Sequence, residues 1–188
     1  MCSSIRSAKT VPNFFLVQKM TVENRKPILS VAQTSQKIRR IAFEMYERNF
    51  SENEIMLAGI TGEGYEMARQ LADELRAISP FVVTLVKIDI DKLQPHAHLV
   101  RFDIEKTELA GKVVIVIDDV LNTGRTLAYS LSPLLGIKVK KVQVAVMINR
   151  AHHTFPIFAD YVGYSISTTL NEHVQVVLTG QDAGVYLN

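Results

Sequence analysis

Apolar residues are distributed along the chain in two patterns, continuous runs and a helical spacing. Four apolar runs rich in β-branched residues are long enough for strands buried on both faces. Between them, apolar residues recur at the three- and four-residue spacing of amphipathic helices. The runs predict strands at residues 55–60, 81–88, 113–117 and 141–148, followed by short strands at 161–164 and 174–179. Strands that alternate with helices indicate a single α/β domain, with a mainly parallel sheet flanked by helices.

Three segments carry the helical spacing. The first follows Ser30 and Gln33, a pair typical of a capping box at a helix start. Its apolar side chains recur at positions 38, 41, 42, 45 and 46. The second helix is expected over residues 65–75, and the third begins near residue 125.

Proline marks two interruptions of this pattern. Pro133 is expected to bend or end the third helix near Ser132. Residues 89–110 contain Pro95 and show no clean period, which predicts a long loop or a loop that holds a short hairpin. Long loops inside compact domains are usually lids or binding loops, so this segment is a candidate part of a functional site.

Composition narrows the class of protein. Of 188 residues, 47% are hydrophobic and 21% are charged, which is ordinary for a soluble domain with a core of its own. The formal net charge of +2 gives no global electrostatic case for nucleic-acid binding. No apolar run approaches the ~20 residues of a membrane span. Cys2 is the single cysteine, so no disulfide framework is possible, which fits a cytoplasmic protein.

The first 27 residues differ from the rest. They mix Ser, Lys, Arg and Asn, and their apolar patch at 14–17 is too short for a signal peptide. We expect residues 1–27 to form a flexible tail, with Met20 as an alternative initiator, rather than an arm docked on the domain. Residues 28–188 are then expected to form the folded domain.

The stretch VVIVIDDVLNTGRT at residues 113–126 carries the strongest chemical signal. A buried strand leads into adjacent carboxylates, Asp118 and Asp119, and then into a turn that opens a helix. The backbone N–H groups of such a turn and the helix N-terminus attract phosphate. Carboxylates beside them can accept hydrogen bonds from vicinal ribose hydroxyls or hold a hydrated divalent cation. The order of these parts predicts a site for a phosphorylated sugar.

This stretch resembles the 5-phosphoribosyl-1-pyrophosphate (PRPP) binding motif of type I phosphoribosyltransferases. Over about residues 28–188, the chain is similar to one subgroup, the pyrimidine operon attenuator proteins that are also uracil phosphoribosyltransferases. The resemblance implies the type I phosphoribosyltransferase fold with a small C-terminal hood, in a protein that forms dimers or higher assemblies. It is carried by IRRIAFEMYERN (38–49), ARQLADEL (68–75), DDVLNTGRT (118–126), VQVAVMINRAHHTFPIFADYVG (142–163) and the closing VQVVL.

The resemblance also implies a reaction, in which a nucleobase nitrogen displaces pyrophosphate from C1 of PRPP and gives a nucleoside 5′-monophosphate. Mg²⁺ on the pyrophosphate oxygens would carry much of the leaving-group charge. Asp118 and Asp119 would hold the ribose hydroxyls or metal-bound waters, and Lys87 would close over PRPP from the flexible loop. The 5′-phosphate would lie on Thr123, Gly124, Arg125 and Thr126.

A second family element is the pyrophosphate loop, which matches Thr61, Gly62, Glu63 and Gly64. The two glycines permit backbone conformations that bring amides close to an anion. Glu63 replaces the basic residue of close relatives, and a carboxylate beside pyrophosphate is repulsive unless a metal or a neighbour screens it. For the loop cation, Arg101 and the pair His96 and His98 are alternatives to Lys87.

The nucleobase is predicted to lie near Asn149, Arg150, Tyr161 and Val162, although ordinary core packing also explains Tyr161. Purine-specific relatives carry an aspartate at the position of Asn122 and a lysine at the position of Asn149. An asparagine is neutral and cannot act as a general base. These departures favour uracil over a 6-oxopurine.

Two other functions stay open. The subgroup also binds messenger RNA as a sensor of UMP. Here the basic residues after the fourth strand are largely replaced by His and aromatic residues, and a solvated helix face explains Lys37, Arg39, Arg40 and Arg48. Because RNA binding needs cations that reach phosphates, we expect RNA attenuation to be weakened or absent.

The other open function is a protein that binds PRPP or a nucleotide with little turnover. Glu63 and the missing loop arginine motivate it. Separately, Phe155, Phe158 and Tyr164 are more apolar than a lone surface segment needs, which predicts that oligomers form through that region.

Overall fold

The computed structural model describes residues 25–150, 152–167 and 172–188. Its main sheet has six strands in the order β4-β3-β2-β5-β6-β7, and all neighbours pair in parallel except β4, which is antiparallel to β3. The predicted α/β fold is therefore confirmed. The strands are β2 (Glu54–Ile60), β3 (Val82–Asp89), β4 (Arg101–Phe102), β5 (Val113–Leu121), β6 (Lys141–Arg150) and β7 (Tyr161–Ile166).

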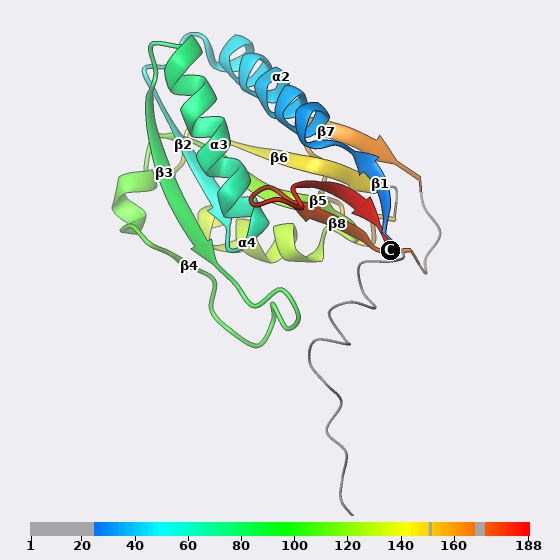
Figure 1. Cartoon of the computed structure of the whole chain (residues 1–188). Helices are drawn as coiled ribbons and strands as arrows, with labels where there is room; N and C mark the ends of the chain where they lie inside the picture. The colour runs from blue at the N-terminus through cyan, green and yellow to red at the C-terminus, as the bar shows by residue number, and fades with distance from the viewer. Residues whose placement is uncertain (1–24, 151, 168–171) are drawn as a thin grey trace, which may run out of the picture.

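Helices cover both faces of this sheet (Figure 1). Helices α2 (Val31–Asn49) and α3 (Glu63–Ile78) pack against each other on one face, and α4 (Arg125–Leu135) packs on the other. Alternate side chains of β5 serve the two layers: Ile115 joins the α2/α3 core, and Val116 joins the α4 core. This double coverage is why the strand is apolar at every position from Val113 to Ile117.

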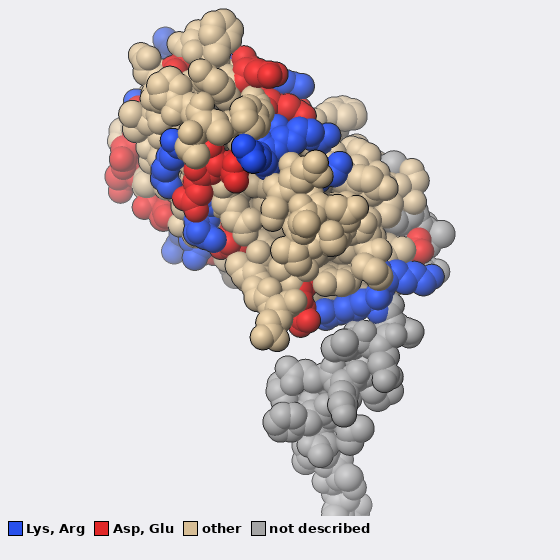
Figure 2. Space-filling model, turned by 45° about the horizontal axis from the view of Figure 1, so that its top comes forward, with Lys and Arg blue, Asp and Glu red and all other residues tan. Residues whose placement is uncertain are grey.

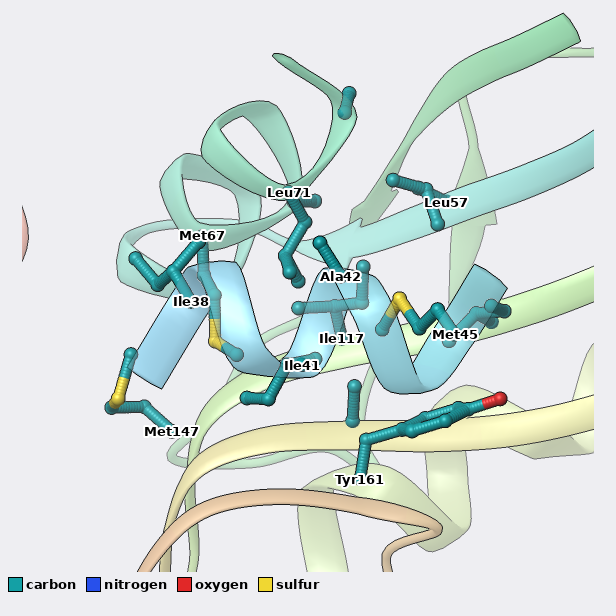
Figure 3. Packing of buried hydrophobic residues seen from close by; sticks show 14 of the residues in the cluster. Ile38, Ile41, Ala42, Met45, Leu57, Met67, Leu71, Ile117, Met147 and Tyr161 are labelled. Carbon is teal, nitrogen blue, oxygen red and sulfur yellow. The ribbon is translucent and has the colours of Figure 1, made fainter. Parts of the chain in front are cut away.

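The α2/α3 layer forms as its sequence pattern predicts. The Ser30 hydroxyl accepts the Gln33 N–H at 3.3 Å, and the Gln33 side chain accepts the Ser30 N–H at 2.9 Å, which confirms the capping box. From this start, Ile41 and Met45 point into the space between α2, α3 and the sheet (Figure 3). Both side chains are fully buried.

A second, antiparallel sheet joins the two ends of the described chain. Its order is β1 (Lys26–Leu29), β9 (Gly184–Leu187) and β8 (Val174–Val177). The predicted tail is therefore too long, because Lys26 and Pro27 belong to β1. β1 is an edge strand, where a proline that lacks a donor is tolerated. Met20 and the rest of the expected tail lie outside the described residues, as does Cys2.

The expected end of the third helix is wrong. Helix α4 continues through Pro133 and ends at Leu135, three residues beyond Ser132. Because Pro133 lies in the last turn, the proline removes one hydrogen bond and does not interrupt a long helix.

The segment 89–110 holds the short hairpin that its sequence allowed, formed by β3 and β4. A 3₁₀ turn, η1 (Lys106–Leu109), follows it. Within the described ranges, no helix is both long enough and apolar enough to cross a membrane.

Candidate active site

The carboxyl ends of β2, β5 and β6 lie next to one another at one edge of the main sheet. Gly59 of β2 pairs with Ile117 of β5, and Leu121 of β5 pairs with Asn149 of β6. Ligands of open α/β sheets bind at this edge, in the crevice beyond the strand ends. The segments that follow these strands are therefore brought together by the parallel register, although they are far apart in the sequence.

The start of α3 lies directly against the acid pair, Asp118 and Asp119. A Cβ placed on Gly64 would lie 3.0 Å from Cα and Oδ1 of Asp118 and 3.0 Å from the Ile117 carbonyl oxygen. Gly62, the N-cap of α3, has φ 96°, a conformation that L side chains rarely adopt. The N–H groups of Tyr65 and Glu66 donate to the Gly62 carbonyl, at 3.1 and 3.2 Å, so the amides of Glu63 and Gly64 are the ones placed to bind an anion beside Asp118.

The acid pair is buried at the end of β5. The Asp118 side chain is 4% exposed and that of Asp119 is 20% exposed. Asp118 Oδ1 accepts the Asp119 N–H at 3.0 Å. Burial, and then the charge of Asp119, raise the pKa of Asp118 to about 8. Burial also disfavours the charge of Asp119, but its hydrogen bond with Asp118 and the charge of Lys92 outweigh that effect and lower the pKa of Asp119.

Lys92 is the cation of this site, and it was not predicted. Its Nζ lies 2.8 Å from Asp118 Oδ1 and 3.0 Å from Asp119 Oδ1. Burial disfavours the ammonium charge, but the two carboxylates outweigh it and raise the pKa of Lys92. Lys92 stands three residues after the end of β3, in the loop that joins β3 to β4, and its side chain reaches the end of β5. A usable signal was present, because Lys92 is the first basic residue after that strand.

Lys87, the predicted loop cation, does not reach the site. It lies inside β3, which continues to Asp89, and its side chain is exposed and makes no ion pair with any residue of the described ranges. Its backbone N–H donates to Asp103 Oδ1 at 2.8 Å. Lys87 lies inside the strand that the sequence predicted at 81–88, and the alternation of that strand, not the loop after it, sets the direction of its side chain.

The other predicted loop cations do not contact the acid pair either. Arg101 is exposed in β4, and the side chains of His96 and His98 are exposed. His98 Nε2 lies 4.0 Å from Asp91 Oδ2. No group of three or more His, Cys, Asp or Glu side chains that could hold a metal ion occurs among the described residues.

The turn between β5 and α4 forms a small pocket, lined by Asp118 and residues 120–127. Gly124 has φ 81° and is the N-cap of α4. Its site is also tight, because an added Cβ would lie 3.3 Å from Cβ of Ile157. The Thr123 carbonyl accepts N–H groups from Thr154 and Phe155, both at 3.0 Å. The predicted phosphate turn is therefore held in shape by the segment after β6.

The Glu63 side chain binds the backbone next to β8, in the small antiparallel sheet. Its Oε2 accepts the Leu178 N–H at 2.8 Å, and Gln70 Nε2 donates to the Leu178 carbonyl at 3.1 Å. The carboxylate that departs from the family pattern therefore fastens α3 to the end of β8. Thr61 is also engaged, since its N–H and its hydroxyl both donate to the Ile88 carbonyl, at 2.9 and 2.8 Å. This leaves the N-terminal amides of α3, rather than the Thr61 side chain, for an anion.

The predicted base-binding residues separate into two groups. Asn149 and Arg150 end β6 beside the phosphate turn, and Asn149 Oδ1 lies 3.0 Å from His153 Nε2. Tyr161 is fully buried under α2 and its hydroxyl accepts from Asn49 Nδ2 at 3.1 Å (Figure 3). Val162 follows it in β7 and packs against the α4 core. The base-binding prediction for Tyr161 is wrong, because the residue begins β7, far from the carboxyl end of the strand.

Replacement of Tyr161 tests this correction. Tyr161→Phe keeps the ring and loses one hydrogen bond, so the free energy of unfolding is expected to fall by about 1 kcal/mol. Tyr161→Ala leaves a cavity in the core under α2 and is expected to lower the free energy of unfolding by about 3–5 kcal/mol. Urea unfolding gives both values. A Tyr161→Phe variant with unchanged stability and a large rise in KM for the nucleobase would contradict the structural role.

Comparison with known proteins gives the class of this protein. The phosphoribosyl transferase domain family matches residues 25–179, so the chain belongs to that family. The fold agrees, since a hypoxanthine phosphoribosyltransferase structure from Trypanosoma cruzi superposes with a TM-score of 0.70 at 16% identity, over 86% of this chain and 95% of that one. A hypoxanthine-guanine phosphoribosyltransferase from Bacillus anthracis gives 0.63 at 21% identity, over 77% and 84%. The protein is a type I phosphoribosyltransferase.

Sequence relatives narrow the family further. The Bifunctional protein PyrR of Streptomyces coelicolor is 34% identical over 167 residues, which cover 85% of this chain and 86% of that protein. The protein of the same name from Fusobacterium nucleatum is 36% identical over 152 residues, covering 77% and 86%. These relatives confirm the resemblance to the pyrimidine attenuator subgroup.

Proposed function

We propose that this protein transfers ribose 5-phosphate from PRPP to uracil, giving UMP and pyrophosphate. One observation carries the proposal: the acid pair, the turn at the start of α4 and the start of α3 meet at one edge of the sheet, with Gly64 in direct contact with Asp118. The acids lie between the N-termini of two helices, α3 and α4, as a ribose with phosphate at C5 and pyrophosphate at C1 requires.

Each part has one task in this reaction. Residues 123–126 bind the 5′-phosphate through the amides of the turn and the N-terminus of α4. Asp118 and Asp119 accept hydrogen bonds from the ribose hydroxyls and fix the position of C1. The start of α3, residues 62–64, binds the pyrophosphate. As a nitrogen of uracil forms its bond to C1, the C1–O bond to pyrophosphate breaks and its electron pair leaves with the pyrophosphate, while the proton of that nitrogen is lost to solvent. Positioning of the two reactants and exclusion of water are then the main contributions of the protein.

The acid pair also fits a divalent cation that is held largely by water and substrate. Both carboxylates already contact one cationic group, the Lys92 ammonium, so their geometry suits a shared positive charge. Mg²⁺ usually takes one or two protein carboxylates and completes its shell with waters and phosphate oxygens. Bound there, Mg²⁺ supplies positive charge to the departing pyrophosphate. Asp118 and Asp119 would hold its waters.

Uracil is favoured over purines by the residues at the end of β6. Asn149 offers an amide beside the phosphate turn, where purine-specific relatives carry a lysine. An amide can both donate and accept, which matches the adjacent N–H and carbonyl groups of a pyrimidine edge. Asn122, exposed in the turn, is neutral and provides no base for a purine nitrogen.

A pyrophosphate-release assay tests the proposal. With PRPP and Mg²⁺, uracil is expected to give the highest kcat/KM among uracil, hypoxanthine, guanine, xanthine and orotate. Release with a purine and none with uracil would overturn the choice of base. Tight PRPP binding without release for any of the five bases would favour the nucleotide-binding protein with little turnover.

RNA binding is a second candidate function, favoured by the similarity to proteins named bifunctional. The cations of α2 are largely engaged within the chain: Arg40 donates to the carbonyls of Val162 and Gly163, and Arg48 donates to that of Asp160 at 3.0 Å. On the face seen in Figure 2, Lys and Arg lie among Asp and Glu. A strong, salt-dependent retention of a pyrimidine leader RNA in a filter-binding titration would establish this function.

Self-association and a cytoplasmic location also stay predictions. Phe158 and Tyr164 are 75% and 40% exposed, which leaves an apolar surface after β6. Phe155 is only partly exposed, because it packs against Tyr129 and Gly124. The surface expected to associate is therefore smaller than the sequence suggests.

A further inference from the structure

Lys92 is presented to the acid pair by a locally ordered turn. Asp91 Oδ1 accepts the N–H groups of Leu93 and Gln94, at 2.9 and 3.1 Å, so the backbone on either side of Lys92 is held by its neighbour. The Gln94 carbonyl in turn accepts the Ala97 N–H at 3.0 Å. The lysine therefore approaches the acids from a shaped loop and not from a disordered one.

The ammonium satisfies both acids at once. Asp118 Oδ1 accepts from Lys92 Nζ and from the Asp119 N–H, and Asp119 Oδ1 accepts from the same Nζ. A ribose diol or a metal-bound water must reach these carboxylates to bind. The carboxylates thus have a cationic partner before any ligand binds, and a ligand must displace the Lys92 ammonium from them.

The Lys92 side chain is nevertheless exposed enough to move away from the two carboxylates. Its side chain is 37% exposed, whereas that of Asp118 is 4% exposed. The neighbouring Leu93 is 89% exposed and contributes little packing to hold the turn down. An ammonium on a flexible four-carbon stem exchanges a carboxylate for water more easily than a buried group does.

We propose that Lys92 is a displaceable counter-ion, which neutralises the acid pair in the ligand-free protein and competes with the divalent cation and the ribose hydroxyls for Asp118 and Asp119. This inference rests on the proposed function of the site and adds its regulation. Lys92 acts through the acids and is a positioning residue. The consequence is weak binding of a metal ion on its own, so that the cation enters together with PRPP.

Binding of Mn²⁺ alone, followed by loss of the free-ion signal in electron paramagnetic resonance, tests the competition directly. We expect Lys92→Met to bind Mn²⁺ at least tenfold more tightly than the wild type. Lys92→Arg retains the charge and should bind as weakly as the wild type. Lys106→Met, which removes a lysine of η1 that contacts neither acid, is the matched control and should leave Kd unchanged.

Thermal unfolding provides a readout independent of binding. Without metal, Lys92→Met leaves the acids without their counter-ion and should melt below the wild type. Mn²⁺ should then raise its Tm by several degrees and that of the wild type hardly at all. If Lys92→Met does not fold, Lys92→Gln, which keeps a donor but no charge, takes its place.

Three results would overturn the inference: an equal or weaker Mn²⁺ affinity in both neutral variants, tight Mn²⁺ binding by the wild type, or tight binding by Lys106→Met alone. None of these measurements uses PRPP or a base. Absent turnover together with the expected Mn²⁺ results would therefore overturn the proposed reaction and support the competition. Normal turnover with unchanged Mn²⁺ affinity would support the proposed reaction and overturn the competition.

Discussion

Asp118→Asn and Asp119→Asn are each expected to lower kcat/KM for PRPP by about 10²–10³-fold. The amide keeps the shape of the side chain but loses the charge and one of the two strong acceptors that the ribose hydroxyls and metal-bound waters need. Pyrophosphate release under subsaturating PRPP measures the effect. Because the acids act on the same ribose, the double variant should lose less than the product of the two single losses.

Urea unfolding of the same variants shows whether a loss of activity comes from the missing carboxylate or from a destabilised fold. Asp118 is buried, and a neutral amide is easier to bury than a carboxylate, so Asp118→Asn should unfold at a urea concentration close to that of the wild type. Asp182→Asn is the matched control, since this exposed carboxylate lies in the turn before β9 and forms no ion pair within the described residues. Either active-site variant with kcat/KM within threefold of the wild type would exclude the acid pair from the reaction.

Gly64→Ala is expected to lower the free energy of unfolding by about 1–3 kcal/mol and to impair turnover at the same time. The added methyl group would lie 3.0 Å from Cα of Asp118 and 3.0 Å from the Ile117 carbonyl oxygen, and both are backbone atoms that cannot rotate away. Either α3 or the end of β5 must move, and both carry the site. Urea unfolding and pyrophosphate release measure the two effects.

Gly136→Ala provides the matched comparison for that variant. Gly136 follows α4 with φ −88°, and the nearest atom to an added Cβ is the Pro133 carbonyl oxygen at 3.8 Å. Alanine fits there, so the free energy of unfolding should change by no more than about 0.5 kcal/mol. If both variants lost the same free energy of unfolding, the contact between α3 and Asp118 would not be the cause of the destabilisation in Gly64→Ala.

The local structure around the candidate site was predicted correctly where its parts are consecutive in the sequence. The strand, the acid pair and the turn of residues 113–126 are covalently adjacent, so local propensity and chain geometry place them together. The loop of residues 61–64 also follows a buried strand directly, which is why the sequence located it. In a parallel sheet, such segments necessarily meet at the carboxyl edge, whatever the loops between them do.

The mistakes concern residues whose role depends on distant contacts. The resemblance gave Lys87 the role of a loop cation, although the predicted strand at 81–88 contained it, and β3 keeps it in the sheet. Tyr161 was placed near the base, but it begins β7 and packs beneath α2. Both strands were predicted close to their observed bounds, so these errors came from roles carried over from the family and not from misplaced strand ends.

The sequence by itself determined the alternation of strands and helices, the class of sheet and the turn of residues 123–126, because each follows from the pattern of residues close in the chain. Only the tertiary structure decided that Lys92 holds the acid pair and that Glu63 binds the Leu178 amide. These contacts join residues 26 and 115 positions apart, through loops whose paths no periodicity specifies. Their physical origin is the folded arrangement of strand ends, where charges and donors from separate segments come within hydrogen-bond distance.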